Sequence, residues 1–273
     1  LGLLQAVVER QASLVARWMG VGFIHGVMNT DNMTISGETI DYGPCAFLEH
    51  FDPRAVFSSI DTSGRYAYGN QPAIAQWNLA RLADALLPLI DADAESAAQR
   101  AGAAVEAFAE RFDFHWTSVL RLKLGLDGSS GDDRALADDY LKLMSQYRID
   151  FTLAFARLAD AAQGNDTPLR ALFGGTGAAL ELWLKRWRER TQAVGTSQVE
   201  LAAALRSANP IYIPRNHHVE AALAAAVERD NLAPFERLLR VLEHPFDEHP
   251  ADISLAEPAP AELTENYRTF CGT

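Results

Sequence analysis

The helical periodicity of the chain beyond residue 71 constrains its fold more than any other feature. Apolar side chains recur there at intervals of three and four residues, and alanine-rich runs such as 221–227 favour helix strongly. The opening of the chain has the same spacing. We predict helices over residues 3–19, 72–90, 95–112, 114–124, 134–146, 151–162, 177–190, 197–207, 218–229 and 234–242. The sequence therefore predicts a mostly α fold.

The segment from Val21 to Leu48 is the least helical part of the sequence. Its apolar residues come in short pieces, which are Phe23–Ile24, Met33–Ile35 and Ile40, and glycine, asparagine, aspartate and serine interrupt them. This pattern predicts short strands joined by tight loops.

Two further stretches lack periodicity. Residues 50–70 contain Pro53, Gly64 and Gly69 and predict an irregular loop, which is long enough to suggest a role in function. Residues 244–260 are rich in proline and predict an extended tail over the surface.

The charge of the chain excludes one class of partner. A formal charge of −12 and a pI near 5.0 repel a polyphosphate backbone, so we expect no tight binding of nucleic acid. A single nucleotide can still bind where divalent cations neutralise its phosphates.

The sequence also indicates where the protein resides. No stretch reaches the roughly 18 apolar residues of a membrane span, and the first helix carries charges in amphipathic spacing, unlike a signal peptide. Two cysteines, Cys45 and Cys271, are too few for a secreted disulfide framework. We therefore expect a soluble, cytoplasmic protein with no membrane partner.

The chemistry is concentrated in two neighbouring motifs, His25-Gly-Val-Met-Asn-Thr-Asp-Asn32 and Ile40-Asp-Tyr-Gly43. A loop that ends in asparagine, then a short strand, a turn and a strand that ends in Asp-Tyr-Gly, is the layout by which kinase folds present magnesium ligands. Mg²⁺ prefers hard oxygen ligands and keeps several waters, so one amide and one carboxylate from adjacent loops suffice. Asn32 and Asp41 fit these roles.

The position that carries the base in kinases holds a different residue here. Counting from His25 by the kinase pattern places the base at Val27 and the metal-binding asparagine at Asn32. Valine cannot accept a proton. Either the chain has no kinase activity, or another carboxylate has taken the role, and Asp31 is the nearest candidate.

These motifs belong to a longer set that resembles a known family. The set comprises H-G-V-M-N-T-D-N-M-T-I at 25–35, I-D-Y-G-P at 40–44, G-R-Y-A-Y-G-N-Q-P at 64–72, N-P-I-Y-I-P-R-N at 209–216 and F-C-G-T at 270–273. In these blocks, which span nearly the whole chain, the sequence resembles the selenoprotein O (SelO/YdiU) family of pseudokinase-fold adenylyltransferases.

The resemblance implies a reaction and a set of roles. It implies Mg-dependent transfer of AMP from ATP, bound in a flipped orientation, to Ser, Thr or Tyr hydroxyls of proteins, with Mn²⁺ as an alternative metal. Asp31 would accept the proton, Asn32 and Asp41 would hold the metal, and Asp41 would also face the nucleotide. Cys271 falls where family members carry cysteine or selenocysteine, which implies a redox-responsive thiol.

The resemblance also implies a domain organisation. Family members carry a smaller N-terminal lobe with a glycine-rich loop and a lysine, whereas the first lysine here is Lys123. We therefore expect residues 1–273 to form one domain, a kinase-like C-lobe with a helical C-terminal extension and no N-lobe. Such a chain alone should have little activity.

Two other functions remain open from the sequence. A kinase-fold phosphotransferase would use the same ligands, because a fold alone does not fix function. A nucleotide-binding regulator without catalysis would account for Val27 and for the missing lobe.

Overall fold

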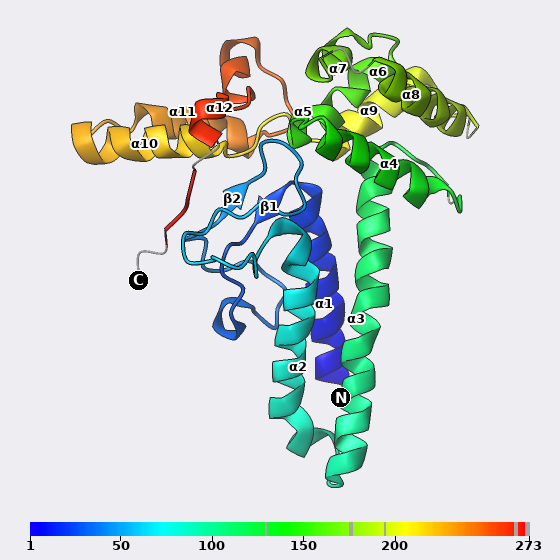
Figure 1. Ribbon diagram of the computed structural model, residues 1–273, viewed down its shortest axis with the longest axis vertical. Coiled ribbons are helices and arrows are strands. Elements are labelled where there is room, and N and C mark those ends of the chain that lie inside the picture. Colours follow the sequence, from blue (N-terminus) through cyan, green and yellow to red (C-terminus); the bar gives the residue numbers. More distant parts are fainter. Residues whose placement is uncertain (129, 175–176, 194, 265–266, 271–273) are drawn as a thin grey trace. The chain divides into compact units, whose positions relative to one another are not determined.

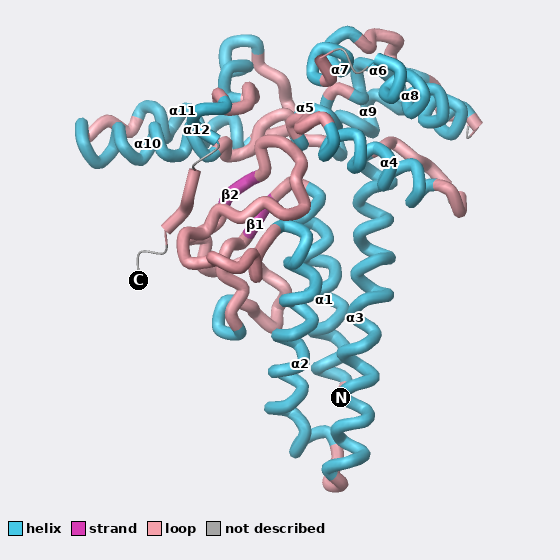
Figure 2. The backbone as a smooth tube through the Cα atoms, in the orientation of Figure 1, coloured by secondary structure: helices cyan, strands magenta, loops and turns pink. Residues whose placement is uncertain are grey.

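The computed structural model describes residues 1–128, 130–174, 177–193, 195–264 and 267–270. Most of these residues are helical, and one sheet of two short strands, in the order β1-β2, accompanies the helices (Figure 2), which confirms the mostly α prediction. The chain divides into two compact units. One comprises residues 1–46, 53–119 and the described part of 268–273, and the other comprises 47–52 and 120–267.

The first unit contains the least helical segment and the helices on either side of it. Its elements are α1 (Gly2–Gly20), β1 (Phe23–Ile24), the 3-10 helices η1 (Thr30–Asn32) and η2 (Tyr68–Asn70), α2 (Gln71–Ile90) and the first part of α3 (Ala94–Lys123), and β2 (Ala46–Phe47) begins in it. Helices α1 and α2 lie side by side (Figure 1). Their apolar stripes meet, with Val8, Ala12, Ala75 and Leu79 all buried, because residues three and four apart share one face of a helix.

Helix α3 corrects one of the predictions. We predicted two helices with a break at Asp113, but the structure has a single helix of 30 residues. Neither glycine nor proline occurs near Asp113, so nothing in the local sequence ends the helix.

The second unit is a set of shorter helices that pack in pairs. They are the end of α3, α4 (Asp133–Gln146), α5 (Phe151–Ala156), α6 (Leu158–Ala162), α7 (Thr167–Leu172), α8 (Gly177–Gln192), α9 (Gln198–Ala208), α10 (Asn216–Arg229), α11 (Ala233–Glu243), the 3-10 helix η3 (Pro250–Leu255) and α12 (Ala261–Thr264). Helix α4 packs on α8, α6 on α9, and α10 on α11. The sequence missed α7 and joined α5 to α6, because helices of five or six residues carry too little periodicity to detect.

The proline-rich stretch after α11 was wrongly predicted to be extended. Residues 250–255 form η3, and Leu255 and Ala256 are buried in a cluster with Tyr212, Leu238 and Val241. Burial of these two side chains favours a compact path.

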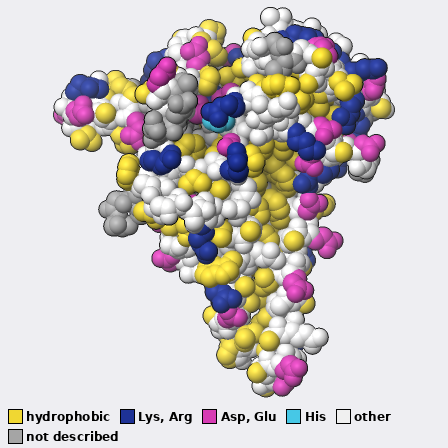
Figure 3. All heavy atoms as spheres, in the orientation of Figure 1, with side chains coloured by type: hydrophobic (Ala, Val, Ile, Leu, Met, Phe, Trp, Pro, Cys, Tyr) yellow, Lys and Arg dark blue, Asp and Glu magenta, His cyan; other side chains and the backbone are white. Residues whose placement is uncertain are grey.

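Two observations concern the surface. None of the described helices combines the length and the apolarity that crossing a bilayer requires. On the face drawn in Figure 3, positive and negative side chains are interspersed, with hydrophobic side chains between them.

Candidate nucleotide and metal site

His25 organises the segment that carries the predicted site. Its side chain is fully buried, and its Nε2 atom lies 2.9 Å from the carbonyl oxygen of Ile40. Because a carbonyl oxygen only accepts, Nε2 carries the proton, and Nδ1 is left to accept from the Val27 N–H at 3.4 Å. Both ring nitrogens therefore bind backbone, which is a structural role.

The charge state of His25 agrees with this arrangement. Burial lowers its pKa, while the Ile40 carbonyl and the negative charge of Asp41 act in the opposite direction. The imidazole is neutral near pH 7, which matches one N–H donor and one acceptor.

A short antiparallel bridge separates the two predicted metal ligands along the chain. Met33 and Thr39 form this isolated antiparallel bridge. Asn32, the last residue of η1, directly precedes the bridge, and Asp41 follows it by two residues. Short strands were predicted at Met33–Ile35 and Ile40, and within the described residues the pairing between them is this single bridge.

The predicted ligands Asn32 and Asp41 carry oxygens of the kind that a hard cation prefers. Asn32 Nδ2 donates to the Val27 carbonyl at 3.0 Å, which fixes the amide and leaves its oxygen for another partner. Asp41 is exposed, and its φ of 55° places it in the left-handed region that few residues other than glycine adopt. The half-buried Asn32 amide and the exposed Asp41 carboxylate carry oxygens of the type that Mg²⁺ prefers.

Asp31 is available for proton transfer in the same loop. It lies on η1, directly before Asn32, and its side chain is exposed. Val27, by contrast, is only 5% exposed, so the position of the kinase base points into the core. Asp31 is thus an exposed carboxylate next in sequence to the predicted metal ligand Asn32.

Gly26 is required by the path of this loop. Its φ is +86°, and a Cβ built there would lie 2.4 Å from the carbonyl oxygen of Pro44. Any side chain at this position would force Pro44 away. Gly26 and Pro44 belong to the sequence blocks 25–35 and 40–44.

The motif at 64–72 contributes residues that we had not assigned to the site. The Tyr66 hydroxyl donates to Asn29 Oδ1 at 2.7 Å, directly before η1. The Asp61 carboxylate in turn accepts the N–H groups of Arg65 and Tyr66 at 2.8 and 2.7 Å. The tyrosine therefore steadies the loop that carries Asp31, a contact between distant residues that one sequence cannot reveal.

Cys45 does not add a reactive thiol to this chemistry. Burial raises the pKa of Cys45 to about 11, so its thiol carries little thiolate at neutral pH. Cys271 lies outside the described residues, and its redox role stays a prediction.

A loop with a carboxylate, next to a bridge that has an amide before it and a second carboxylate after it, is typical of proteins that hold a divalent cation beside a phosphate-bearing ligand. The comparisons define the protein more closely. The chain belongs to the family described as protein adenylyltransferase SelO, whose model matches residues 2–243.

Several bacterial relatives cover the whole of the chain or nearly all of it. The proteins named protein nucleotidyltransferase YdiU from Cereibacter sphaeroides (strain ATCC 17029) and Chromobacterium violaceum are 58% and 56% identical to it, and both matches cover 100% of the chain. The protein of the same name from Rhizobium etli is 52% identical over 99% of the chain. The matches cover 55%, 57% and 54% of these three relatives, so the chain spans about half their length.

Proposed function

We propose that the protein to which this chain belongs transfers AMP from ATP to hydroxyl groups of Ser, Thr or Tyr in other proteins. The observation that carries the proposal is the Met33–Thr39 bridge, because Asn32 directly precedes it, Asp41 follows it by two residues, and Asp31 is the neighbour of Asn32 in η1. The description of the family and the name of the relatives, both of which denote nucleotide transfer, support the same reaction.

The residues divide the work of the reaction. Asn32 and Asp41 would hold Mg²⁺ or Mn²⁺, which would neutralise the triphosphate and stabilise the charge that develops on it. The acceptor hydroxyl oxygen forms a bond to the α-phosphorus while the bond to the bridging oxygen breaks and pyrophosphate leaves. Asp31 accepts the hydroxyl proton, for which its exposure and its place in the loop suit it.

One observation favours a second candidate. Val27 is buried where kinases carry their base, which would suit a protein that binds a nucleotide without turning it over. A phosphotransferase is the third candidate. A labelled phosphate on ATP separates the three, because AMP transfer attaches the α-phosphate to the acceptor, phosphotransfer attaches the γ-phosphate, and binding alone attaches neither. Because the chain spans only about half of its relatives, the test requires the full-length protein.

The test follows the α- and γ-phosphates separately. We expect the full-length protein, with Mg²⁺ and ATP, to attach label from the α-phosphate and none from the γ-phosphate. Asp31→Asn should lower this transfer by roughly 10²- to 10⁴-fold, the usual contribution of a positioned base.

Glu38→Gln provides the matched control. Glu38 is an exposed carboxylate in the turn between Met33 and Thr39, where it accepts from the Ser36 hydroxyl at 2.7 Å. This change should leave the rate unaltered. Transfer of the γ-label, or full activity of Asp31→Asn, would exclude the proposed mechanism.

A further inference from the structure

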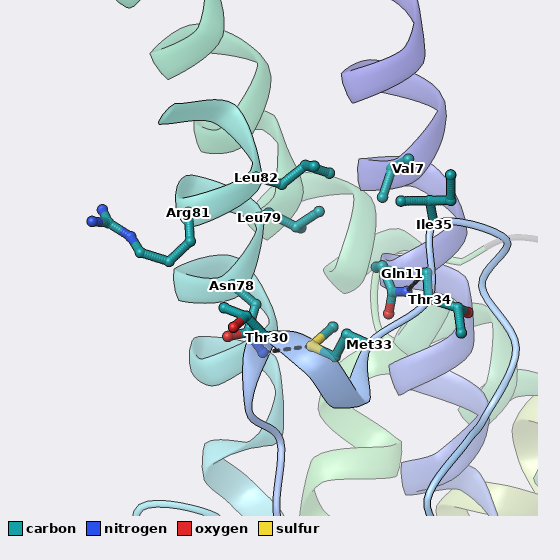
Figure 4. A pocket seen from close by; sticks show the side chains of 10 residues that line it. All are labelled: Val7, Gln11, Thr30, Met33, Thr34, Ile35, Asn78, Leu79, Arg81 and Leu82. Carbon is teal, nitrogen blue, oxygen red and sulfur yellow. Dashed lines mark hydrogen bonds between the residues drawn. The ribbon is translucent and has the colours of Figure 1, made fainter. Parts of the chain in front are cut away.

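A cavity lies between α1, α2 and η1, beside the loop that carries Asp31. It has a volume of about 350 Å³. Figure 4 shows Leu79 and Leu82 of α2 on one side and Val7 of α1 with Ile35 on the other, and Met33 lies at one end. The volume is at the low end for ligand sites, which suits one or two apolar side chains better than a nucleotide.

Two buried side chains in the cavity wall each have an oxygen without a partner. Gln11 is 2% exposed and Asn78 is 6% exposed, and both line the cavity. Gln11 Nε2 donates to the Thr34 carbonyl at 2.5 Å, and Asn78 Nδ2 donates to the Met28 carbonyl at 2.9 Å. In both side chains the amide nitrogen is used in a hydrogen bond, so the amide oxygen is the atom that remains to accept one.

Neither oxygen finds a donor within the described residues. Gln11 Oε1 and Asn78 Oδ1 are both buried without a hydrogen bond. A buried acceptor left unsatisfied costs about 1–3 kcal/mol, so a donor supplied to either oxygen would be favourable. The cavity therefore suits a ligand that brings N–H or O–H donors together with an apolar group.

Beside the cavity, Arg81, Trp77 and Arg65 form a positive surface that we call the rim. Arg81 lines the cavity, and the Arg81 guanidinium lies 5.4 Å from the centre of the Trp77 ring, which is 45% exposed. The Arg65 guanidinium lies 4.9 Å from the same ring. Arg81 also contacts Asp84 in an exposed pair, whereas the Arg65 guanidinium has no carboxylate partner within the part of the chain that the structure describes.

This rim is a local departure from the charge of the chain as a whole, which is −12. Two guanidinium groups on one exposed tryptophan would attract an anionic group, and the attraction would be strongest for the arginine that has no partner.

We propose that the cavity and its rim dock the acceptor protein through an extended segment that carries an apolar and an acidic side chain. The apolar side chain enters between Leu79 and Leu82 and the opposite wall, and backbone N–H groups of the segment donate to Gln11 and Asn78. The acidic side chain binds Arg65 and Arg81. An extended peptide is the ligand that supplies all three features at once.

The docked segment would lie next to the reacting groups. Thr30 lines the cavity and directly precedes Asp31. A hydroxyl a few residues along the segment would reach the loop. The inference thus rests on the proposed function and specifies its substrate, which is a hydroxyl residue flanked by apolar and acidic residues.

Binding is tested first, without ATP, so that the result does not depend on transfer. Among the tryptophans of this chain Trp77 is exposed, while Trp18, Trp116, Trp183 and Trp187 are at most 7% exposed. Full-length protein labelled with 5-fluorotryptophan would be titrated with a serine peptide that carries leucine and two aspartates. We expect the fluorine resonance that Trp77→Phe removes to shift, and a peptide with two lysines in place of the aspartates to leave it unchanged.

Transfer is tested next, with the same two peptides and a third in which alanine replaces leucine. We expect the KM of the first peptide to be lower by roughly tenfold than that of either other, which corresponds to one ion pair or one buried side chain. Arg65→Glu should reverse the preference between the aspartate and lysine peptides. A reversal cannot arise from misfolding, and Lys185→Glu, the same charge change on exposed α8, should not produce it.

The two failures are distinguishable. The docking site is overturned if the Trp77 resonance does not shift with the aspartate peptide, or if the KM values of the three peptides are equal. Occupation of the cavity by another segment of the full-length protein would overturn it as well. Absence of AMP on every acceptor and absence of pyrophosphate release overturn the proposed function instead.

Discussion

At the residue scale, Asp41 is one of three described residues other than glycine with a positive φ, together with Arg148 and Asp230. Asp41 has a φ of 55°, a conformation that costs most residues about 1 kcal/mol and that aspartate and asparagine tolerate best. A glycine would relieve that cost, yet the chain has a carboxylate there. The strain is explained if the carboxylate is needed at this position.

Substitutions at Asp41 should therefore separate stability from activity. Asp41→Asn tolerates the same conformation, so its free energy of unfolding should match that of the original chain. Asp41→Ala should lose about 1 kcal/mol, because alanine is strained at positive φ. Both should lose nearly all AMP transfer in the full-length protein, whereas thermal unfolding should rank only the alanine variant lower. Activity of Asp41→Asn close to the original would contradict a role in holding the metal.

The sequence offered candidate ligands because their spacing is local. Asn32 and Asp41 lie on either side of the Met33–Thr39 bridge, so their types and their separation suggested them, and their role as ligands stays a prediction. Tyr66, Gln11 and Asn78 were not assigned, since their roles depend on contacts between residues far apart in the chain. Such contacts leave no trace in a single sequence.

At the scale of elements, a buried ionic network joins four segments of the second unit. Arg215, at the start of α10, is fully buried and donates to Glu49 at 2.6 Å, to Asp150 at 2.5 and 3.1 Å and to the Ala256 carbonyl at 2.8 Å. Asp150 also caps α5 by accepting the Leu153 N–H at 2.7 Å. Burial nevertheless raises the pKa of Glu49, since the attraction of Arg215 is the smaller effect.

Removing the cation of this network should be costly. Arg215→Met leaves two buried carboxylates without the cation that they share, and we expect a loss of about 3–5 kcal/mol in the free energy of unfolding, measured in urea. Arg237→Met is the matched control. Arg237 is 41% exposed and pairs with Asp252 at 2.7 Å, so its loss should cost no more than about 1 kcal/mol. Equal effects of the two changes would show that the network is not a support of the second unit.

Element boundaries were predictable where periodicity extends over three turns or more. Helices α1, α2 and α4 begin and end within two residues of the predicted bounds. The continuity of α3 was not predictable, because Phe112 to Phe114 gives no signal for or against a break. Neither was the compact tail, whose η3 forms because Leu255 and Ala256 are buried.

At the scale of the whole molecule, one buried amine links stability to pH. Lys123 is 4% exposed, and burial lowers its pKa from an ordinary 10.5 to about 7. Its Nζ lies 4.3 Å from the centre of the Phe155 ring and 5.5 Å from that of Phe151, and both rings favour the charged form and offset part of the cost. Between about pH 7 and pH 10.5 the unfolded chain holds a proton on this lysine that the folded chain has lost. Stability from this group therefore rises with pH across that range, and the cost is greatest below about pH 7.

Lys123→Met should remove this dependence. We expect it to raise the free energy of unfolding by on the order of 3 kcal/mol near neutral pH, with the gain shrinking toward pH 10.5. Urea unfolding at about pH 6.5 and about pH 9.5 gives the comparison. Lys185→Met, at a side chain that is 74% exposed, should show no such trend. A gain of the same size at both pH values would mean that the amine is not the cause.

The central claim is that Asn32 and Asp41 together hold a divalent cation. The most direct measurement is the anomalous diffraction of Mn²⁺ in crystals of the full-length protein with a non-hydrolysable ATP analogue. We expect one peak within about 2.0–2.5 Å of both Asn32 Oδ1 and an Asp41 carboxylate oxygen, the distances usual for hard cations and oxygen ligands, with the peak lost in Asp41→Asn. A metal bound to the nucleotide but distant from both side chains would contradict the account.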